Sequence, residues 1–122
     1  MVDPIEQEIL NKGLTAPRIT PADVEANIVG EHYFTAADAV YGDENKGPYG
    51  GGGSHKEPLD LLTFCVLVLK NGFTVTGESA CASPENFDAE VGQKIARRNA
   101  VDKIWPLMGY ELKSKLHQLE QH

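Results

Sequence analysis

The side chains with the clearest chemical potential are basic residues within one predicted helix. Lys94, Arg97 and Arg98 recur at steps of three and four residues, and Lys103 follows about a turn further on. These four account for more than a third of the 11 Lys and Arg residues in a chain whose net charge is −7. Because arginine forms two parallel hydrogen bonds to a phosphate group, the pattern predicts a local anion site.

The start of the same helix offers further contacts for a nucleotide. Asn86 supplies an amide, Phe87 supplies an aromatic face, and the first helical turn has free backbone N–H groups. We include Thr76, from the preceding strand, in this candidate ligand-binding site. About three helical turns, roughly 15 Å, separate the helix start from Arg97. A symmetric neighbour would therefore supply one half of the site, and we expect a homo-oligomer.

A solvated helix face is the alternative interpretation of these basic residues. Glu90 and Lys94 are spaced as an i,i+4 ion pair, which stabilises a helix without any ligand. If carboxylates of the same chain bind the basic side chains, that would favour the solvated face and argue against the anion site. The sequence leaves both interpretations open.

No catalytic or metal-binding motif accompanies the basic helix. The sequence lacks HExxH, GxSxG and GxxxxGK[ST], its four histidines are scattered, and neither cysteine lies near a histidine. We therefore expect a protein that is not an enzyme, with no catalytic residues, no cofactor and no metal. Cys65 and Cys81 are expected to be free thiols, because strand alternation would point their sulfur atoms apart.

A β-hairpin is the element expected to support the helix. The segments LLTFCVLVLK and FTVTGESA flank Asn71-Gly72, the strongest short hairpin signal. A two-residue turn would place Lys70 opposite Phe73. The first strand is apolar on both faces, as in strands that are covered on both sides. We expect one face to pack on helices and the other to meet a subunit or form a partly covered pocket; the helix-facing residues would be Phe64, Val66, Val68, Phe73 and Val75.

Two further helices are predicted from their N-terminal signals. Ser83-Pro84 would begin a long helix that Trp105-Pro106 ends or kinks, with a last helix over residues 110–122. Its core-facing residues would be Phe87, Val91, Ile95, Ala96, Ala100, Val101 and Ile104. Thr20-Pro21 would begin a helix that runs to about His32, or onward to Tyr41.

These elements predict one α+β domain over residues 1–122. Its β-hairpin-based antiparallel sheet would pack against the long C-terminal helix and an N-terminal helix. Residues 1–18 form an N-terminal arm in this prediction. Residues 42–58, which include four consecutive glycines, form a flexible loop.

The charge distribution limits the classes of partner. Residues 1–60 hold eleven acidic and four basic residues, whereas residues 61–122 hold seven of each. An acidic chain is poorly suited to general nucleic-acid binding, because that affinity comes largely from basic groups at phosphates. No apolar run approaches the ~20 residues that cross a bilayer, and the first residues do not resemble a signal peptide. We expect a cytoplasmic protein with no membrane partner.

Two blocks of the sequence resemble small accessory proteins of tailed phages and prophages. They are ITPADVEANIVGEHYFTAADAV (residues 19–40) and LLTFCVLVLKNGFTVTGESACASPENFDAEVGQKIARRNAVDKIWPLMGYEL (residues 61–112). The resemblance implies a non-structural phage protein expressed in a bacterial cytoplasm. In size, α+β composition and its aromatic and arginine residues, the chain is also similar to phage anti-defence sponges. Those proteins are homo-oligomers that sequester nucleotide signals such as cyclic ADP-ribose variants or cyclic oligonucleotides.

Two functions follow as expectations. The first is counter-defence by binding and sequestering a small anionic nucleotide-type signal molecule. The alternative is a protein–protein inhibitor or adaptor that binds a host defence or nucleic-acid enzyme through its acidic N-terminal half. In that case Glu25, Glu31 and Asp38 would meet a basic groove of the host protein. An enzyme without recognisable motifs and a structural or assembly role remain as further hypotheses.

Overall fold

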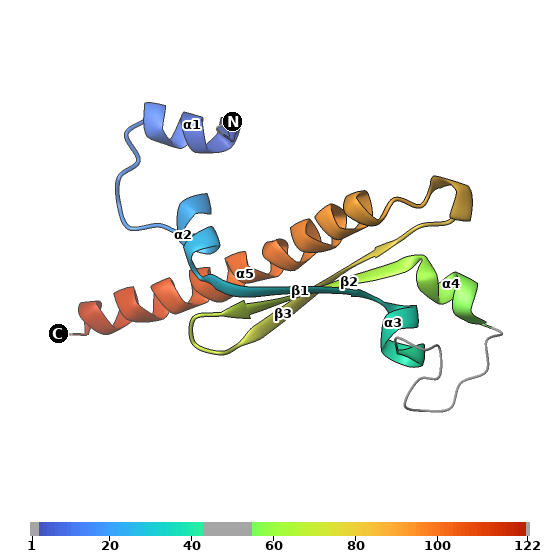
Figure 1. Cartoon of the computed structure of the whole chain (residues 1–122). Helices are drawn as coiled ribbons and strands as arrows, with labels where there is room; N and C mark the ends of the chain where they lie inside the picture. The colour runs from blue at the N-terminus through green and yellow to red at the C-terminus, as the bar shows by residue number, and fades with distance from the viewer. Residues whose placement is uncertain (1–2, 43–54, 122) are drawn as a thin grey trace.

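A three-stranded antiparallel sheet crossed by one long helix makes up most of the protein (Figure 1). The computed structural model describes residues 3–42 and 55–121. The elements, in chain order, are α1 (Pro4–Asn11), α2 (Pro21–Ala26), β1 (Ile28–Thr35), α3 (Ala36–Tyr41), α4 (Lys56–Asp60), β2 (Leu62–Leu69), β3 (Thr74–Ala80), the 3-10 turn η2 (Pro84–Asn86) and α5 (Ala89–Glu120). The predicted α+β class is confirmed.

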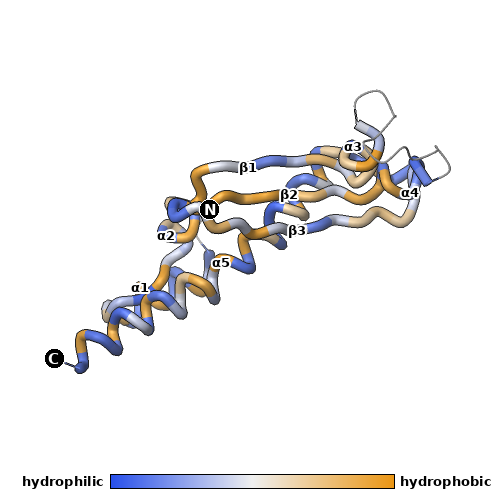
Figure 2. Tube along the Cα trace, turned by 90° about the horizontal axis from the view of Figure 1, so that it is seen from below, coloured by the Kyte–Doolittle hydropathy of each residue, from blue (hydrophilic) through white to orange (hydrophobic). Residues whose placement is uncertain are grey.

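The strand order is β1-β2-β3, so the strongly apolar β2 lies in the centre of the sheet (Figure 2). The β2–β3 hairpin is confirmed, but its predicted register is wrong by one residue. Its loop has three residues, because the Leu69 N–H donates to the Phe73 carbonyl and the Gly72 N–H donates to the Leu69 carbonyl, both at 2.8 Å. Gly72 has φ +89°, which only glycine adopts without strain.

The register decides which face of the sheet meets α5. Val75 pairs with Leu67, and not with Val68 as a two-residue turn would require. Cys65, Leu67, Leu69 and Val75 are therefore buried on the face that packs on α5. The prediction that Phe64, Val66 and Val68 face the helix is wrong: they lie on the opposite face and are half-buried, and Phe73 is 57% exposed.

The predicted helix after Thr20-Pro21 ends early. A capping box between Thr20 and Asp23 begins α2 as expected, but the helix stops at Ala26. Residues Ile28–Thr35 form strand β1, which pairs antiparallel with β2. Two signals in the sequence argue against a continuous helix here. Gly30 is a poor helix former, and Thr35 and Asp38 form a second capping box that begins α3.

The long helix differs from its prediction at both ends. Asp88, rather than Ser83, is the N-cap of α5, and its side chain accepts a hydrogen bond from the Val91 N–H at 2.9 Å. Pro106 lies inside a continuous helix, so the helix does not end at Trp105-Pro106, and residues 110–120 continue α5 rather than form a separate helix. Figures 1 and 2 both show this C-terminal part extending beyond the sheet.

Small residues allow α5 to lie directly on β3. The buried face of the helix repeats every four residues through Gly92, Ala96, Ala100 and Ile104. A Cβ atom at Gly77 of β3 would lie 2.1 Å from the Ala96 carbonyl oxygen and 2.3 Å from the Ala100 nitrogen. Only glycine fits between these two backbones, and this contact fixes the height of the helix above the sheet. Val91, which the sequence assigned to the core face, is 52% exposed.

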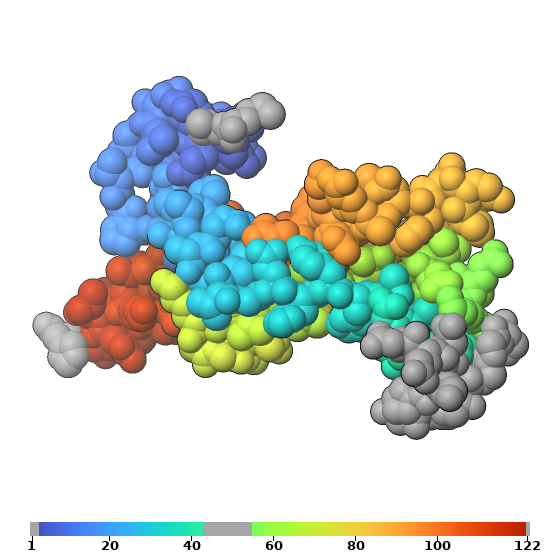
Figure 3. All heavy atoms as spheres, in the orientation of Figure 1, coloured from blue at the N-terminus to red at the C-terminus, as the bar shows by residue number. Residues whose placement is uncertain are grey.

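The remaining predictions about the chain ends and loops have mixed outcomes. The N-terminal arm contains helix α1, which stands off the body of the molecule (Figure 3). Within the predicted loop 42–58, residues 56–58 belong to helix α4, and residues 43–54 lie outside the described part. Cys65 and Cys81 are free thiols, as predicted. Among the residues that the structure describes, no helix is long and apolar enough to cross a membrane.

Candidate functional site

Arg97, the central residue of the predicted anion site, is bound by two carboxylates of its own chain. Its Nη atoms donate to Glu25 at 2.8 and 3.1 Å, and its Nε donates to Glu31 at 2.9 Å. The Tyr33 hydroxyl also donates to Glu31, at 2.8 Å. This Glu25–Arg97–Glu31 cluster ties α5 to α2 and β1, three segments that are distant in the sequence.

The electrostatics of this cluster favour its charged form. Hydrogen bonds from Arg97 and Tyr33 lower the pKa of Glu31, and the two carboxylates raise the pKa of Arg97. The Arg97 side chain is 29% exposed, so solvent screens these bonds only in part. A ligand phosphate that bound Arg97 would have to displace carboxylates that already satisfy the guanidinium.

The other three basic residues lie in different environments around α5. Lys94 forms an exposed ion pair with Glu90 at 3.0 Å. Arg98 and Lys103 are exposed, and within the described residues neither has an ion-pair partner. At ~100° per residue, Lys103 points ~120° away from Arg97 and ~140° away from Arg98 around the helix axis. Within one chain, therefore, the four basic residues do not converge on one point.

Asn86 and Phe87 line a pocket at the start of α5. Its volume is about 140 Å³, and its lining includes Ser79, Cys81 and Gly92. This volume falls below the ~300–1,000 Å³ that is typical of small-molecule sites, so it accommodates a ring rather than a whole nucleotide. Asp88 also lines the pocket and carries a negative charge at the helix N-terminus. Phosphate groups of a ligand would have to lie elsewhere.

Thr76 is separated from the rest of the predicted site. It pairs with Val66 on the sheet face opposite to Val75 and Gly77, the face that packs on α5. The structure thus brings Asn86 and Phe87 together, leaves Arg98 and Lys103 as separate exposed bases, and places Thr76 across the sheet.

The acidic residues of the docking alternative have partners within the chain. Glu25 and Glu31 bind Arg97, and the Asp38 carboxylate accepts the Thr35 N–H at 2.9 Å in the second capping box. Their charges are therefore used in part to hold α2, β1 and α3 in place.

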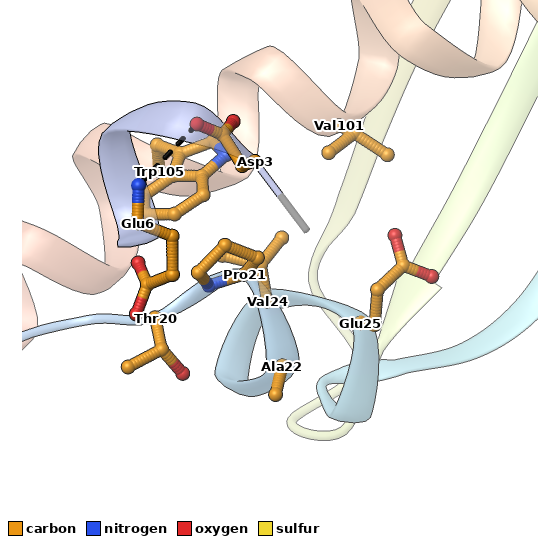
Figure 4. Close-up of a pocket in the computed structure, with 9 residues that line it drawn as sticks. All are labelled: Asp3, Glu6, Thr20, Pro21, Ala22, Val24, Glu25, Val101 and Trp105. Carbon is orange, nitrogen blue, oxygen red and sulfur yellow. Dashed lines mark hydrogen bonds between the residues drawn. The ribbon is translucent and has the colours of Figure 1, made fainter. Parts of the chain in front are cut away.

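A larger cavity lies between α1, α2 and α5 and was not anticipated from the sequence (Figure 4). Its volume is about 460 Å³, and its lining is mostly apolar. Trp105 forms one wall, and the lining consists of Asp3, Glu6, Thr20, Pro21, Ala22, Val24, Glu25, Val101 and Trp105. In the sequence Trp105 served only as a helix-ending signal with Pro106. The lining comes from three segments that only the tertiary fold brings together.

In the described part of the chain, no group of three or more His, Cys, Asp or Glu side chains is placed to bind a metal ion.

Most of the chain matches a known protein family. Residues 19–116 match the model described as the Phage protein (N4 Gp49/phage Sf6 gene 66) family. No curated protein and no solved structure matches the chain. The matched range includes α2 through most of α5 and excludes α1.

Proposed function

The chain belongs to this phage protein family, and we propose that it is a non-enzymatic counter-defence protein that binds and sequesters a small anionic nucleotide-type signal in the bacterial cytoplasm. The observation that carries the proposal is the pocket at the start of α5, where Phe87 and Asn86 offer an aromatic face and an amide to a nucleobase. Neither catalytic machinery nor a cofactor enters the proposal.

The phosphates of such a ligand require basic groups from another copy of the chain. Arg98 and Lys103 are exposed and, among the described residues, have no ion-pair partner, and Arg98 lies nine residues along α5 from the first helical residue, Ala89. At 1.5 Å per residue this is ~14 Å, too far for one compact ligand to contact both ends within one chain. A homo-oligomer that places Arg98 of one copy beside Phe87 of another completes the site.

The proposal predicts ligand-induced stabilisation. Addition of cyclic ADP-ribose variants or cyclic oligonucleotides should raise the melting temperature of the full chain by several degrees for at least one compound. Binding at a hundredfold excess over Kd stabilises a protein by ~2.7 kcal/mol. Differential scanning fluorimetry measures the shift, and native mass spectrometry then reports the number of subunits and of bound ligands together.

Two variants separate the proposed site from a general charge effect. Arg98→Gln should abolish most of the thermal shift, whereas Lys113→Gln, with the same change of charge further along α5, should leave it intact. A complete panel without any shift, or a ligand bound equally well by Arg98→Gln, would remove the proposal.

A further inference from the structure

The cavity between α1, α2 and α5 has a chemistry unlike that of the proposed anion site. Among the described residues that line it, the charged ones are Asp3, Glu6 and Glu25, and none is a Lys or Arg. The nearest guanidinium groups are already bound: Arg18 donates to Glu6 at 2.5 and 3.1 Å, and Arg97 is shared by Glu25 and Glu31. Glu6, Glu25 and Glu31 thus share two guanidinium groups, and Asp3 has no basic partner among the described residues, which leaves an excess of negative charge at the cavity.

The cavity also presents an aromatic surface above an apolar floor. Trp105 is 36% exposed, although it sits in the middle of α5. Val24, Val101 and Pro21 line the same space (Figure 4). A tryptophan indole is the most favourable aromatic partner for a cation, and aliphatic carbons pack well on such a floor.

Asp3 leaves part of its hydrogen-bonding capacity available at the rim of the cavity. Its Oδ1 accepts the Ile5 N–H at 2.8 Å and thereby caps α1. Within the described residues, its Oδ2 has no hydrogen-bond partner. A planar donor that lay against Trp105 would find this carboxylate oxygen on the same cavity wall.

We propose that this cavity binds an arginine side chain of a partner polypeptide. The guanidinium group stacks on the Trp105 indole and donates to Asp3, and the aliphatic stem lies against Val24, Val101 and Pro21. Guanidinium suits the cavity better than ammonium does, because it is flat, weakly hydrated and donates in a fork. A volume of about 460 Å³ accommodates this side chain together with its flanking backbone.

Two carboxylates of the site lie outside the part of the chain that the family model matches. Asp3 and Glu6 lie outside residues 19–116, the range that the family model matches. Membership of the family therefore does not imply the cavity, and the inference is independent of nucleotide binding at Phe87.

The single tryptophan of the sequence gives a direct measurement. We expect the emission of Trp105 to change saturably when the full chain is titrated with the capped peptide Ac-Gly-Arg-Gly-NH2. The matched peptide with citrulline, which is isosteric but uncharged, should bind at least tenfold more weakly. Free propylguanidine, which has the same guanidinium group and aliphatic stem and the same single charge but no peptide backbone, should bind no more tightly than the arginine peptide.

Two variants test the role of the cavity wall. Asp3→Asn should lower the affinity for the arginine peptide about threefold, which is the effect expected from the loss of one partly exposed ion pair. Asparagine caps a helix as well as aspartate does, so α1 is retained. Glu8→Gln removes the same charge from the exposed outer face of α1, where Glu8 pairs with Lys12, and should leave the affinity unchanged.

Three results would overturn the proposal. If the citrulline peptide bound as tightly as the arginine peptide, guanidinium recognition would be excluded. If Asp3→Asn and Glu8→Gln lowered the affinity equally, the binding would be general charge attraction. Tighter binding of propylguanidine than of the peptide would exclude a polypeptide as the source. Far-UV circular dichroism of each variant confirms that the helices are retained before titration.

Discussion

Gly77→Ala should strongly destabilise the native fold. The added Cβ would lie 2.1 Å from the Ala96 carbonyl oxygen and 2.3 Å from the Ala100 nitrogen, both of them backbone atoms. No side-chain rotation relieves this clash, so the whole of α5 would have to move away from β3. Ala96, Ala100 and Ile104 would then lose their packing against the sheet. We expect the free energy of unfolding to fall by ~3 kcal/mol or more, which is at the upper end for substitutions that overpack a core.

Gly109→Ala is the matched control for this prediction. Gly109 lies within α5, and a Cβ there would meet nothing within 4 Å. Because alanine is the better helix former, this variant should be about 0.5–1 kcal/mol more stable than the parent chain. Urea denaturation followed by circular dichroism measures both variants. A Gly77→Ala protein with unchanged stability would show that α5 does not lie as close to β3 as the structure has it.

Arg97→Gln should produce the second largest effect, a loss of about 1–3 kcal/mol in the free energy of unfolding. The substitution removes the hydrogen bonds that join α5 to Glu25 and Glu31, and leaves two neighbouring carboxylates without their shared partner. Lys94→Gln is the control, because its pair with Glu90 is exposed and should contribute less than ~0.5 kcal/mol. Equal effects of the two substitutions would contradict the structural role of Arg97.

The same cluster predicts a specific dependence on pH. Hydrogen bonds from Arg97 and Tyr33 lower the pKa of Glu31 in the folded protein. A lowered carboxylate pKa contributes stability that is fully present above the pKa of the unfolded chain. This contribution is lost as the pH falls through the folded value. The stability of the parent chain should thus decline more steeply with acidification than that of Arg97→Gln, as measured by urea denaturation between pH 7 and pH 3. Parallel profiles would indicate that Arg97 does not set the titration of Glu31.

Arg97→Gln and Arg98→Gln together distinguish a structural role from a role in ligand binding. If Arg97 holds the fold together and Arg98 contacts phosphate, Arg97→Gln should lower the melting temperature of the free protein. Arg98→Gln should instead lower the thermal shift upon ligand addition. The original sequence pattern gave both arginines the same role, whereas their positions around α5 give them different ones.

The cavity beside Trp105 could not be predicted from the sequence, for a physical reason. Asp3, Val24 and Trp105 are widely separated along the chain, and no periodicity connects them. Trp105 lies next to a proline, and that pair indicated a helix end. Once α5 continues through Pro106, the same tryptophan faces α1 and α2.

Local signals in the sequence determined the α+β class, the Asn71-Gly72 hairpin, the start of α2 and the free cysteines, because each depends on residues near one another in the chain. The tertiary structure alone decided the strand nature of Ile28–Thr35, the face of β2 that meets α5, and the partners of Arg97. A one-residue shift in the hairpin exchanges the faces of a strand that is apolar on both sides, so composition could not choose between them. Likewise, a basic residue on a helix attracts whichever carboxylates the fold brings close, and in this protein Glu25 and Glu31 reach Arg97 from α2 and β1.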